Sequence, residues 1–198
     1  MKRIVIIGAT GSGKTTLAGQ LARLLDSPHI ELDALHWNPN WQASSREDFI
    51  EKVDAATKKQ AWVTDGNYTT KIAHLVWTRA DTVIWLDYSF RVTFFRLLSR
   101  TLRRTFTREE CCNGNRENPG NLLSKDSILL WLFQSYWRHR REYPQKLSEP
   151  DYQHLHNVRL RSPKETARWL EHVSRGGIAT SGKQEIELQI KNGKPNFL

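Results

Sequence analysis

Residues 8–15 read GATGSGKT, which satisfies the pattern Gly-x-x-x-x-Gly-Lys-Thr. In such a loop the glycines let consecutive backbone N–H groups point inward around phosphate oxygens, and the following helix N-terminus adds a favourable field. The β-branched run at residues 4–7 precedes the loop, and Leu17, Leu21 and Leu24 follow it at helical spacing. A strand, a phosphate-binding loop and a helix are therefore predicted in that order.

This loop predicts nucleotide binding with a defined role for each kind of residue. Lys14 is expected to reach the β- and γ-phosphates, and Thr15 to ligate Mg²⁺. The expected cofactors are ATP and Mg²⁺. Backbone groups of the remaining loop residues would surround the phosphates: Gly8, Ala9, Thr10, Gly11, Ser12, Gly13 and Thr16.

Strand and helix patterns alternate along the rest of the chain. This alternation predicts an α/β fold with a parallel sheet covered on both faces, and ligands beyond the carboxyl ends of the strands. We expect one P-loop kinase-like domain over residues 1–175, a lid at about 105–122 and a loosely held tail at 176–198. Further strands are expected at 29–33, 61–65, 82–87 and 158–160, and helices at 44–60, 89–105, 124–142 and 163–175.

Three of the expected strands end in an aspartate, so three carboxylates should gather at one edge of the sheet. Asp65 is the best candidate for a second Mg²⁺ contact, because P-loop enzymes take one from a neighbouring strand end. Asp87 is its rival, although its place before Ser89 favours a structural role at a helix start. Asp33 could accept a hydroxyl proton or orient the phosphoryl acceptor. An ordinary turn aspartate explains Asp33 equally well.

Arginines dominate residues 91–141, which carry an excess of seven positive charges out of +9 for the chain. Arg96 and Arg100 lie four apart, hence on one helix face, and Arg138 with Arg141 forms a similar pair on the next helix. Phosphoryl transfer spreads negative charge over the transferring oxygens, which such cations stabilise. We expect two arginine-bearing helices and a polar loop to close over the nucleotide.

The same charge also fits a solvated basic surface, which is the preferred interpretation for Arg103, Arg104 and Arg140. A strongly basic chain further indicates polyanionic partners, including nucleic acid. Nucleic acid is not favoured, because no nucleic-acid-reading motif is present and the charge is concentrated where a kinase lid would be. No apolar run is long enough to cross a bilayer, so a cytoplasmic protein without a membrane partner is expected.

Two residue types near the expected site allow two interpretations each. Trp37 and Trp41 follow Asp33 in an irregular segment, where either could stack on a base or line an acceptor pocket, or pack under a small insert. The adjacent Cys111 and Cys112 fit two loop thiols better than a redox sensor. A disulfide between them would be strained, and two thiols are too few for a structural zinc site.

Several motifs together resemble the adenylate-kinase-like P-loop proteins often labelled DNA topology modulation proteins. The resemblance covers Lys2 to about Val173. It implies a sheet order of 2-3-1-4-5, MgATP and phosphoryl transfer, with adenine near Arg161. The motifs are the P-loop, LDALHW at 32–37, WVTDGNY at 62–68, RADTVIWLD at 79–87 and VRLRSPKE at 158–165.

Resemblance to adenylate kinases themselves is broader, through Asp65-Gly66 and the pair Arg96 and Arg100. The segment after Asp33 lacks their usual nucleoside-monophosphate pattern, so AMP is not expected as the acceptor. The predicted function is transfer of the ATP γ-phosphoryl group to a nucleotide, nucleoside or other small hydroxyl compound. The alternative is an ATP-dependent, nucleic-acid-associated regulator of DNA topology.

Overall fold

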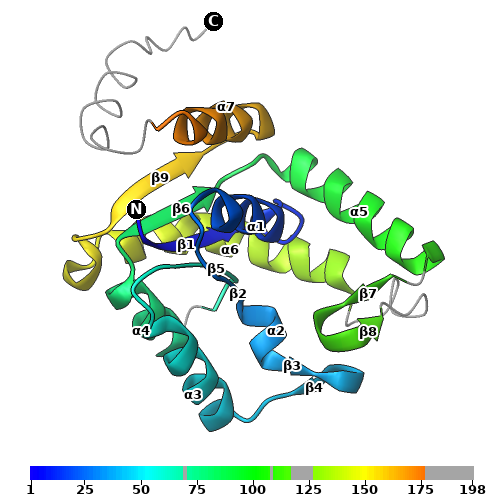
Figure 1. The fold of residues 1–198 in the computed structure, drawn as a ribbon. Helices are drawn as coiled ribbons and strands as arrows, with labels where there is room; N and C mark the ends of the chain where they lie inside the picture. The colour runs from blue at the N-terminus through cyan, green and yellow to red at the C-terminus, as the bar shows by residue number, and fades with distance from the viewer. Residues whose placement is uncertain (69–70, 108, 117–126, 177–198) are drawn as a thin grey trace, which may run out of the picture.

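A five-stranded parallel sheet forms the centre of the molecule (Figure 1). The computed structural model describes residues 1–68, 71–107, 109–116 and 127–176. The strand order is β2-β5-β1-β6-β9, and counting these five strands in chain order makes it 2-3-1-4-5, as the resemblance implies. The predicted α/β class is confirmed. The strands are β1 (Arg3–Gly8), β2 (His29–Glu31), β5 (Trp62–Asp65), β6 (Thr82–Leu86) and β9 (His156–Leu160).

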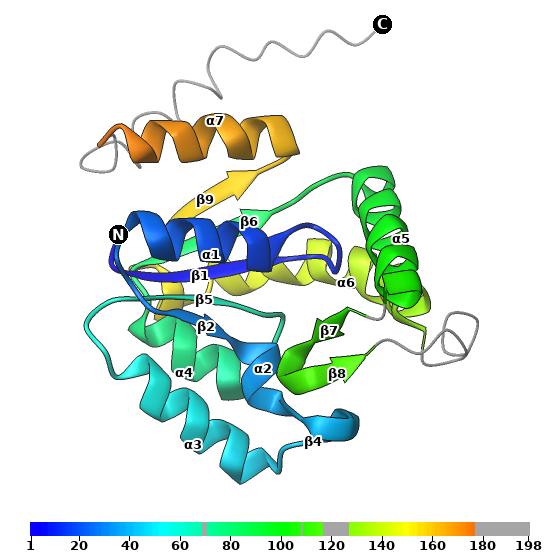
Figure 2. The ribbon, with the colours of Figure 1, turned by 45° about the vertical axis from the view of Figure 1, so that its right-hand side comes forward.

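Helices cover both faces of this sheet (Figures 1 and 2). One face packs against α1 and α7, and the opposite face against α3, α4 and the C-terminal half of α6. The sheet is therefore buried on both sides, which explains its continuous apolar strands. The bounds are α1 (Lys14–Leu24), α3 (Arg46–Thr57), α4 (Lys71–Arg79), α6 (Ile128–Leu147) and α7 (Pro163–Ser174).

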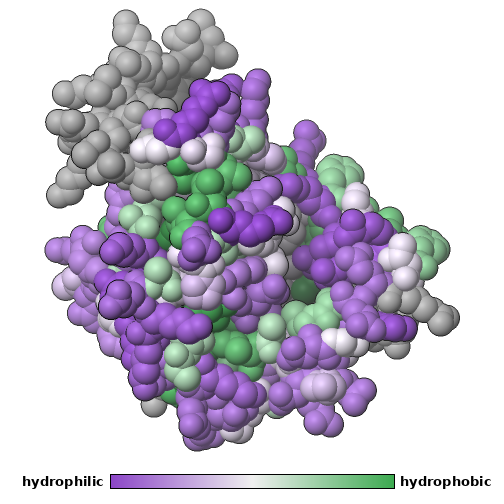
Figure 3. Space-filling model, in the orientation of Figure 1, coloured by the Kyte–Doolittle hydropathy of each residue, from purple (hydrophilic) through white to green (hydrophobic). Residues whose placement is uncertain are grey.

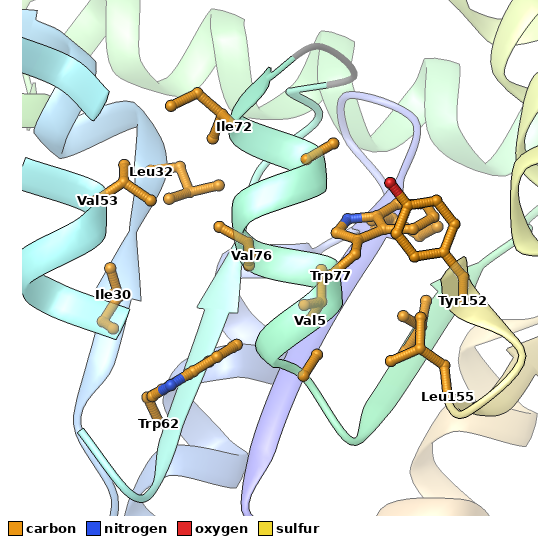
Figure 4. Close-up of a cluster of buried hydrophobic side chains, with 14 of the residues drawn as sticks. Val5, Ile30, Leu32, Val53, Trp62, Ile72, Val76, Trp77, Tyr152 and Leu155 are labelled. Atoms are coloured by element: carbon orange, nitrogen blue, oxygen red, sulfur yellow. The ribbon is translucent and has the colours of Figure 1, made fainter. Parts of the chain in front are cut away.

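The larger core cluster lies between the sheet and the α3–α4 side (Figure 4). Val5 of β1 points into it, whereas its neighbours Ile4 and Ile6 enter the cluster on the other face, because successive strand residues alternate. Trp77 of α4 meets Tyr152 edge to face at 5.3 Å between ring centroids. Apolar packing on both faces fixes the strand register and hence the height of the strand ends that form the site.

Helix α5 (Phe90–Thr107) turns a different side to the core than its apolar spacing predicts. Val92, Phe95, Leu98 and Leu102 share a stripe in the sequence, but Phe95 and Leu102 are exposed and the buried side is Thr93, Leu97 and Thr101. The P-loop is the reason. A Cβ at Gly11 would lie 2.7 Å from the Thr93 carbonyl oxygen and 2.8 Å from Leu97 Cβ, so this side of the helix packs directly against the loop.

Two short segments expected to be irregular contain regular structure. Asp33 lies in the first turn of α2, two residues beyond the end of β2, so the expectation that it ends a strand is wrong.

Helix α4 is not among the expected helices, because its segment follows a glycine-containing break in the sequence pattern. The short elements are α2 (Leu32–His36), β3 (Trp37–Asn38), η1 (Pro39–Trp41), β4 (Gln42–Ala43), β7 (Glu110–Cys111), η2 (Cys112–Gly114), β8 (Asn115–Arg116) and η4 (Pro150–Tyr152).

Some expectations fall outside the described residues. They are residues 117–122 of the lid candidate, the first residues of the helix expected from 124, and residues 177–198 of the tail. Among the described helices, none is long and apolar enough to cross a membrane.

Candidate active site

The P-loop connects β1 to α1 through backbone conformations that favour glycine. Gly11 and Gly13 have φ of 84° and 95°, and Gly13 occupies the position that precedes the first turn of α1. A Cβ at Gly8 would lie 2.7 Å from the Leu86 carbonyl oxygen of β6. The loop is thus held close to its neighbours, with the helix N-terminus directed at the space where phosphates would bind.

Lys14 folds back over this loop. Its Nζ donates to the Gly8 and Ala9 carbonyl oxygens at 2.9 and 3.2 Å. Burial lowers the pKa of Lys14, while Asp65 and Asp33 oppose that shift. Among the described residues the buried Ser12 Oγ has no hydrogen-bond partner. A bound anion would therefore gain a cation and a hydroxyl group that point into the loop.

Thr15 and Asp65 meet where α1 begins and β5 ends. The Thr15 hydroxyl donates to Asp65 Oδ2 at 2.6 Å, and Asp65 is buried. His29 Nε2 lies 2.8 Å from Asp65 Oδ1, and that hydrogen bond raises the pKa of His29. One hydroxyl and one carboxylate oxygen at the mouth of a phosphate loop fit the oxygen ligands that Mg²⁺ prefers, completed by phosphate and water.

Asn67, which the sequence analysis did not assign, ties the P-loop to the end of β5 and to α6. Its Nδ2 donates to the Gly8 carbonyl oxygen at 2.7 Å, and the Gly8 N–H donates to its Oδ1 at 3.3 Å. Tyr143 of α6 donates to the same Oδ1 at 3.1 Å. The signal was present, since Asn67 follows Asp65-Gly66 directly, but its partners lie 59 and 76 residues away.

Two of the expected arginines lie beside the P-loop. Arg96 Nη1 donates to the Ser12 carbonyl oxygen at 3.2 Å, and its guanidinium lies 5.8 Å from the centre of the Tyr88 ring. The charge of Arg100 contributes to the lowered pKa of Lys14, so Arg100 lies within electrostatic reach of that ammonium group. The helix face that carries both arginines therefore borders the phosphate loop.

The other expected pair is placed differently. Arg138 lies over the Trp131 ring at 5.5 Å, and Trp131 is 45% exposed. Arg141 is exposed. Because it follows buried His139 by two residues, the two side chains lie on nearly opposite sides of α6. Burial, together with the charges of Arg138 and Lys14, lowers the pKa of His139 to about 4. The His139 side of α6 therefore lies towards the P-loop. Arg141 therefore points away from the P-loop side of α6.

Arg140, expected to belong to a solvated basic surface, has a partner in the protein instead. Arg140 and Arg159 enclose buried Asp87, with Nε–Oδ1 of 2.8 Å and Nη2–Oδ2 of 2.6 Å respectively. Arg159 also stacks over Trp85 at 4.3 Å. Asp87 thus joins β6, α6 and β9 as a structural ion pair, in line with the structural role favoured for it.

Arg104 likewise departs from a purely solvated role. It is half-buried, and its charge acts on Glu31 at the end of β2. Burial and the nearby Asp65 carboxylate raise the pKa of Glu31, and Arg104 opposes that increase. The helix face of Arg96 and Arg100 therefore extends by one more turn towards the carboxyl edge of the sheet.

Asp33 is the remaining carboxylate near the phosphate loop. Tyr68 donates to Asp33 Oδ1 at 2.9 Å, and burial together with the Asp33 charge raises the pKa of Tyr68. Asp33 is exposed and acts electrostatically on Lys14, so an exposed carboxylate stands near the phosphate loop. An acceptor hydroxyl between Asp33 and the γ-phosphate could pass its proton to this carboxylate.

The hairpin β7–η2–β8 docks on the α2–β4 segment rather than over the nucleotide groove. Asn113 Nδ2 donates to the Ala34 and Trp37 carbonyl oxygens at 2.7 and 2.6 Å. Asn115 Nδ2 donates to the Asn38 carbonyl oxygen at 3.0 Å, and its Oδ1 accepts from the Trp41 N–H at 2.8 Å. Two side chains therefore hold the hairpin against the segment that follows Asp33.

The tryptophans of this region serve the same docking. Trp37 and Trp41 meet edge to face at 5.8 Å, and Trp41 Nε1 donates to the Arg116 carbonyl oxygen at 3.1 Å. Burial and the Asp33 charge raise the pKa of Cys112 to about 11. Cys112 is thus a thiol at neutral pH, which favours the interpretation as an unreactive loop thiol.

A groove of about 560 Å³ leads away from the P-loop between α1, α5 and α7. Such a volume can hold a nucleobase and ribose. Arg161, expected near adenine, is exposed and does not line this groove; its backbone N–H donates to Glu165 Oε2 at 2.7 Å. The lining residues include Ser12, Gly13, Thr16, Tyr88, Arg96, Pro163, Thr166 and Leu170.

Solved structures with a similar fold are small-molecule kinases. A shikimate kinase from Acinetobacter baumannii in complex with shikimate is 16% identical, with a TM-score of 0.53 over 98% of this chain and 96% of that one. Shikimate kinase from Bacteroides thetaiotaomicron is 15% identical, with a TM-score of 0.53 over 90% and 99%. Shikimate kinase from Aquifex aeolicus vf5 is 19% identical, with a TM-score of 0.50 over 88% and 96%.

No protein-family model matches the sequence, and no curated protein matches it. At these identities the structural likeness shows a shared fold alone.

Proposed function

We propose that this protein transfers the γ-phosphoryl group of MgATP to a hydroxyl group of a small molecule. The observation that carries the proposal is that Lys14, Thr15 and Asp65 lie together at the P-loop mouth and that the Asp33 carboxylate lies within electrostatic reach of Lys14. Positioning and charge stabilisation make up most of what phosphoryl transfer requires of a protein.

Each residue has a separate task in this scheme. Lys14 exchanges its bonds to the Gly8 and Ala9 carbonyls for bonds to phosphate oxygens. Thr15 and Asp65 would hold Mg²⁺, which would supply neutralisation of phosphate charge. Arg96 and Arg100 approach from the α5 side and stabilise the transition state.

Asp33 acts on the acceptor. It accepts the proton of the attacking hydroxyl group as that oxygen bonds to the γ-phosphorus, and the bond from phosphorus to the β–γ bridging oxygen breaks. The products are ADP and a phosphate monoester. The scheme keeps Arg138 as a distant helper at most and gives no role to Arg141 or Arg161, whose side chains lie elsewhere.

A small acceptor fits better than a nucleoside monophosphate. The docked hairpin occupies the side of α2 and β3 where a second nucleotide would need room, and it is held there by two asparagines. One of the similar solved structures is a shikimate kinase in complex with shikimate, which is a small molecule and not a nucleotide.

A nucleic-acid-associated ATPase has less support. Arg140 is engaged with Asp87, Arg96 with the P-loop backbone and Arg103 with Glu109, so much of the basic segment serves contacts within the protein. The label of DNA topology modulation remains a resemblance.

The test is ADP formation from MgATP against separate panels of polyols, hydroxy acids, nucleosides and nucleotides. We expect turnover only with an acceptor and loss of at least about 100-fold in Lys14→Ala. Turnover without any acceptor, or stimulated by DNA alone, would contradict the proposal.

A further inference from the structure

An exposed apolar face runs along α5 and α6. Phe106, Phe95 and Trp137 are 82%, 62% and 61% exposed. We call this surface the α5–α6 face; its exposed members are Phe95, Leu102, Phe106, Leu130, Phe133 and Trp137. Figure 3 shows apolar side chains at the right-hand edge of the molecule, where Figure 1 places α5. Isolated exposed apolar residues are ordinary, but a grouped set indicates an interaction surface.

Aromatic contacts join the two helices into one continuous surface. Phe95 meets Phe94 at 5.5 Å, Phe94 meets Phe133 at 5.8 Å, and Phe133 meets Phe90 at 4.9 Å. Phe90 in turn stacks with Trp137 at 6.4 Å. Leu102 and Phe106 extend the stripe along α5 at spacings of seven and eleven residues from Phe95, which is the period of one helix face.

Positive charge borders this face. Arg91 lies one turn before Phe95, Arg141 lies one turn after Trp137, and both are exposed. The sequence of α5 contains no acidic residue, and that of α6 contains only Glu142. Aromatic and aliphatic side chains flanked by arginines on amphipathic helices are the composition that lies at the surface of anionic lipid bilayers.

We propose that the α5–α6 face docks on an anionic phospholipid surface, with its aromatic side chains at the headgroup level and Arg91 and Arg141 against lipid phosphates. Such docking is peripheral and does not require a membrane-spanning helix. The expectation of no membrane partner rested on the lack of a spanning run, and the exposure of Phe95 and Leu102 on α5 changes that conclusion.

The charges and side-chain types of the α5–α6 face favour lipid over two other occupants, a second copy of the chain and a nucleic acid. A second copy related by a two-fold axis would bring this face against itself, and helices α5 and α6 supply only Glu142 to pair with its arginines. Bases of a nucleic acid stack on ring faces, and the aliphatic members of this surface, Leu102 and Leu130, offer none. Lipid headgroups and acyl chains suit both the charge and the aliphatic positions.

The test is co-flotation of the full chain with vesicles of phosphatidylcholine, with and without phosphatidylglycerol. We expect binding only to the phosphatidylglycerol vesicles, weakened by salt. Phe106→Ser and Trp137→Ser should each reduce the bound fraction by about 10-fold. Arg91→Ala should reduce it by several-fold, whereas the control Lys59→Ala, beyond the end of α3, should not. These aromatic variants should fold, because the replaced side chains are mostly exposed.

Three results would overturn the proposal. The first is no binding of the wild-type chain to anionic vesicles. The second is a dimer in light scattering that Phe106→Ser and Trp137→Ser abolish, which would assign the face to a second copy. The third is single-stranded DNA binding lost in the same variants while vesicle binding persists. ATP turnover by the variants is read separately, so failure here leaves the phosphoryl-transfer proposal standing.

Discussion

The Thr15 hydroxyl group donates a 2.6 Å hydrogen bond to Oδ2 of Asp65, fifty residues further along the chain. This contact joins the first turn of α1 to the carboxyl end of β5, and His29 of β2 holds the other carboxylate oxygen. Three neighbouring elements of the sheet edge are thereby fixed around one carboxylate. The proposed Mg²⁺ site rests on this geometry.

Asp65→Asn should raise the Mg²⁺ concentration needed for half-maximal turnover and lower kcat by about 100-fold, because a neutral amide replaces the carboxylate ligand. The measurement is the initial rate of ADP formation over a Mg²⁺ titration. His29→Gln keeps the Asp65 charge and can still donate a hydrogen bond, so its effect should be about 10-fold or less. Equal effects of the two variants would contradict a metal-binding role for Asp65.

Asn67→Ala should lower the free energy of unfolding by about 1–2 kcal/mol, because it removes hydrogen bonds to both backbone groups of Gly8. ATP affinity should fall as well, since the start of the P-loop loses its anchor. Urea denaturation and ATP titration measure the two effects. Asn157→Ala, at an exposed position of β9, is the matched control and should change neither quantity.

His139 should make stability pH-dependent on the acid side. Burial, with the charges of Arg138 and Lys14, lowers its pKa from 6.5 to about 4. Between these values the unfolded chain binds the proton and the folded chain does not, so the free energy of unfolding falls as pH drops through this window. The full contribution, present above pH 6.5, approaches about 3 kcal/mol.

His139→Leu removes this titration while keeping a similar volume. The difference in free energy of unfolding between the wild type and the variant should therefore change from pH 7 to pH 4, in favour of the variant at low pH. Urea denaturation at several pH values measures it. A constant difference across the window would show that His139 is protonated equally in both states.

Asn113→Gly should loosen the hairpin without straining the chain. Asn113 has φ of 56°, a conformation that glycine adopts readily, so the substitution removes only the amide contacts with Ala34 and Trp37. We expect faster hydrogen exchange in residues 34–41 and an acceptor KM raised by about 10-fold, with ATP affinity unchanged. A change in ATP affinity of similar size would place the hairpin at the nucleotide instead.

Local sequence patterns predicted the parts of the site that depend on one segment or on strand ends. GATGSGKT, its flanking strand and helix, and Asp65 lie where these patterns put them, because both faces of a parallel sheet are apolar and its carboxyl ends meet at one edge. Tyr143 and Asn67 escaped prediction because they act through contacts across 76 residues. No local pattern reports such a partner.

The errors have a related physical cause. The stripe of Phe95 and Leu102 has the spacing of a core face, yet α5 turns Thr93 and Leu97 inward to fit against Gly11. Arg140 belongs to a charge run in the sequence, but in the structure it forms an ion pair with buried Asp87. In both cases tertiary contacts decide which side of a helix is covered. Sequence periodicity alone identifies only the sides that could be covered.

The destination of the γ-phosphoryl group tests the central claim most directly. Radiolabelled γ-phosphate ATP, the wild-type protein and the acceptor that stimulates ADP formation are incubated, and the label is separated into inorganic phosphate and acceptor ester. Asp33→Asn and Lys14→Ala serve as the variants with weakened transfer. The account predicts label in a phosphate ester of the acceptor, in amounts equal to ADP. Label found only in inorganic phosphate, at the same rate in Asp33→Asn, would contradict it.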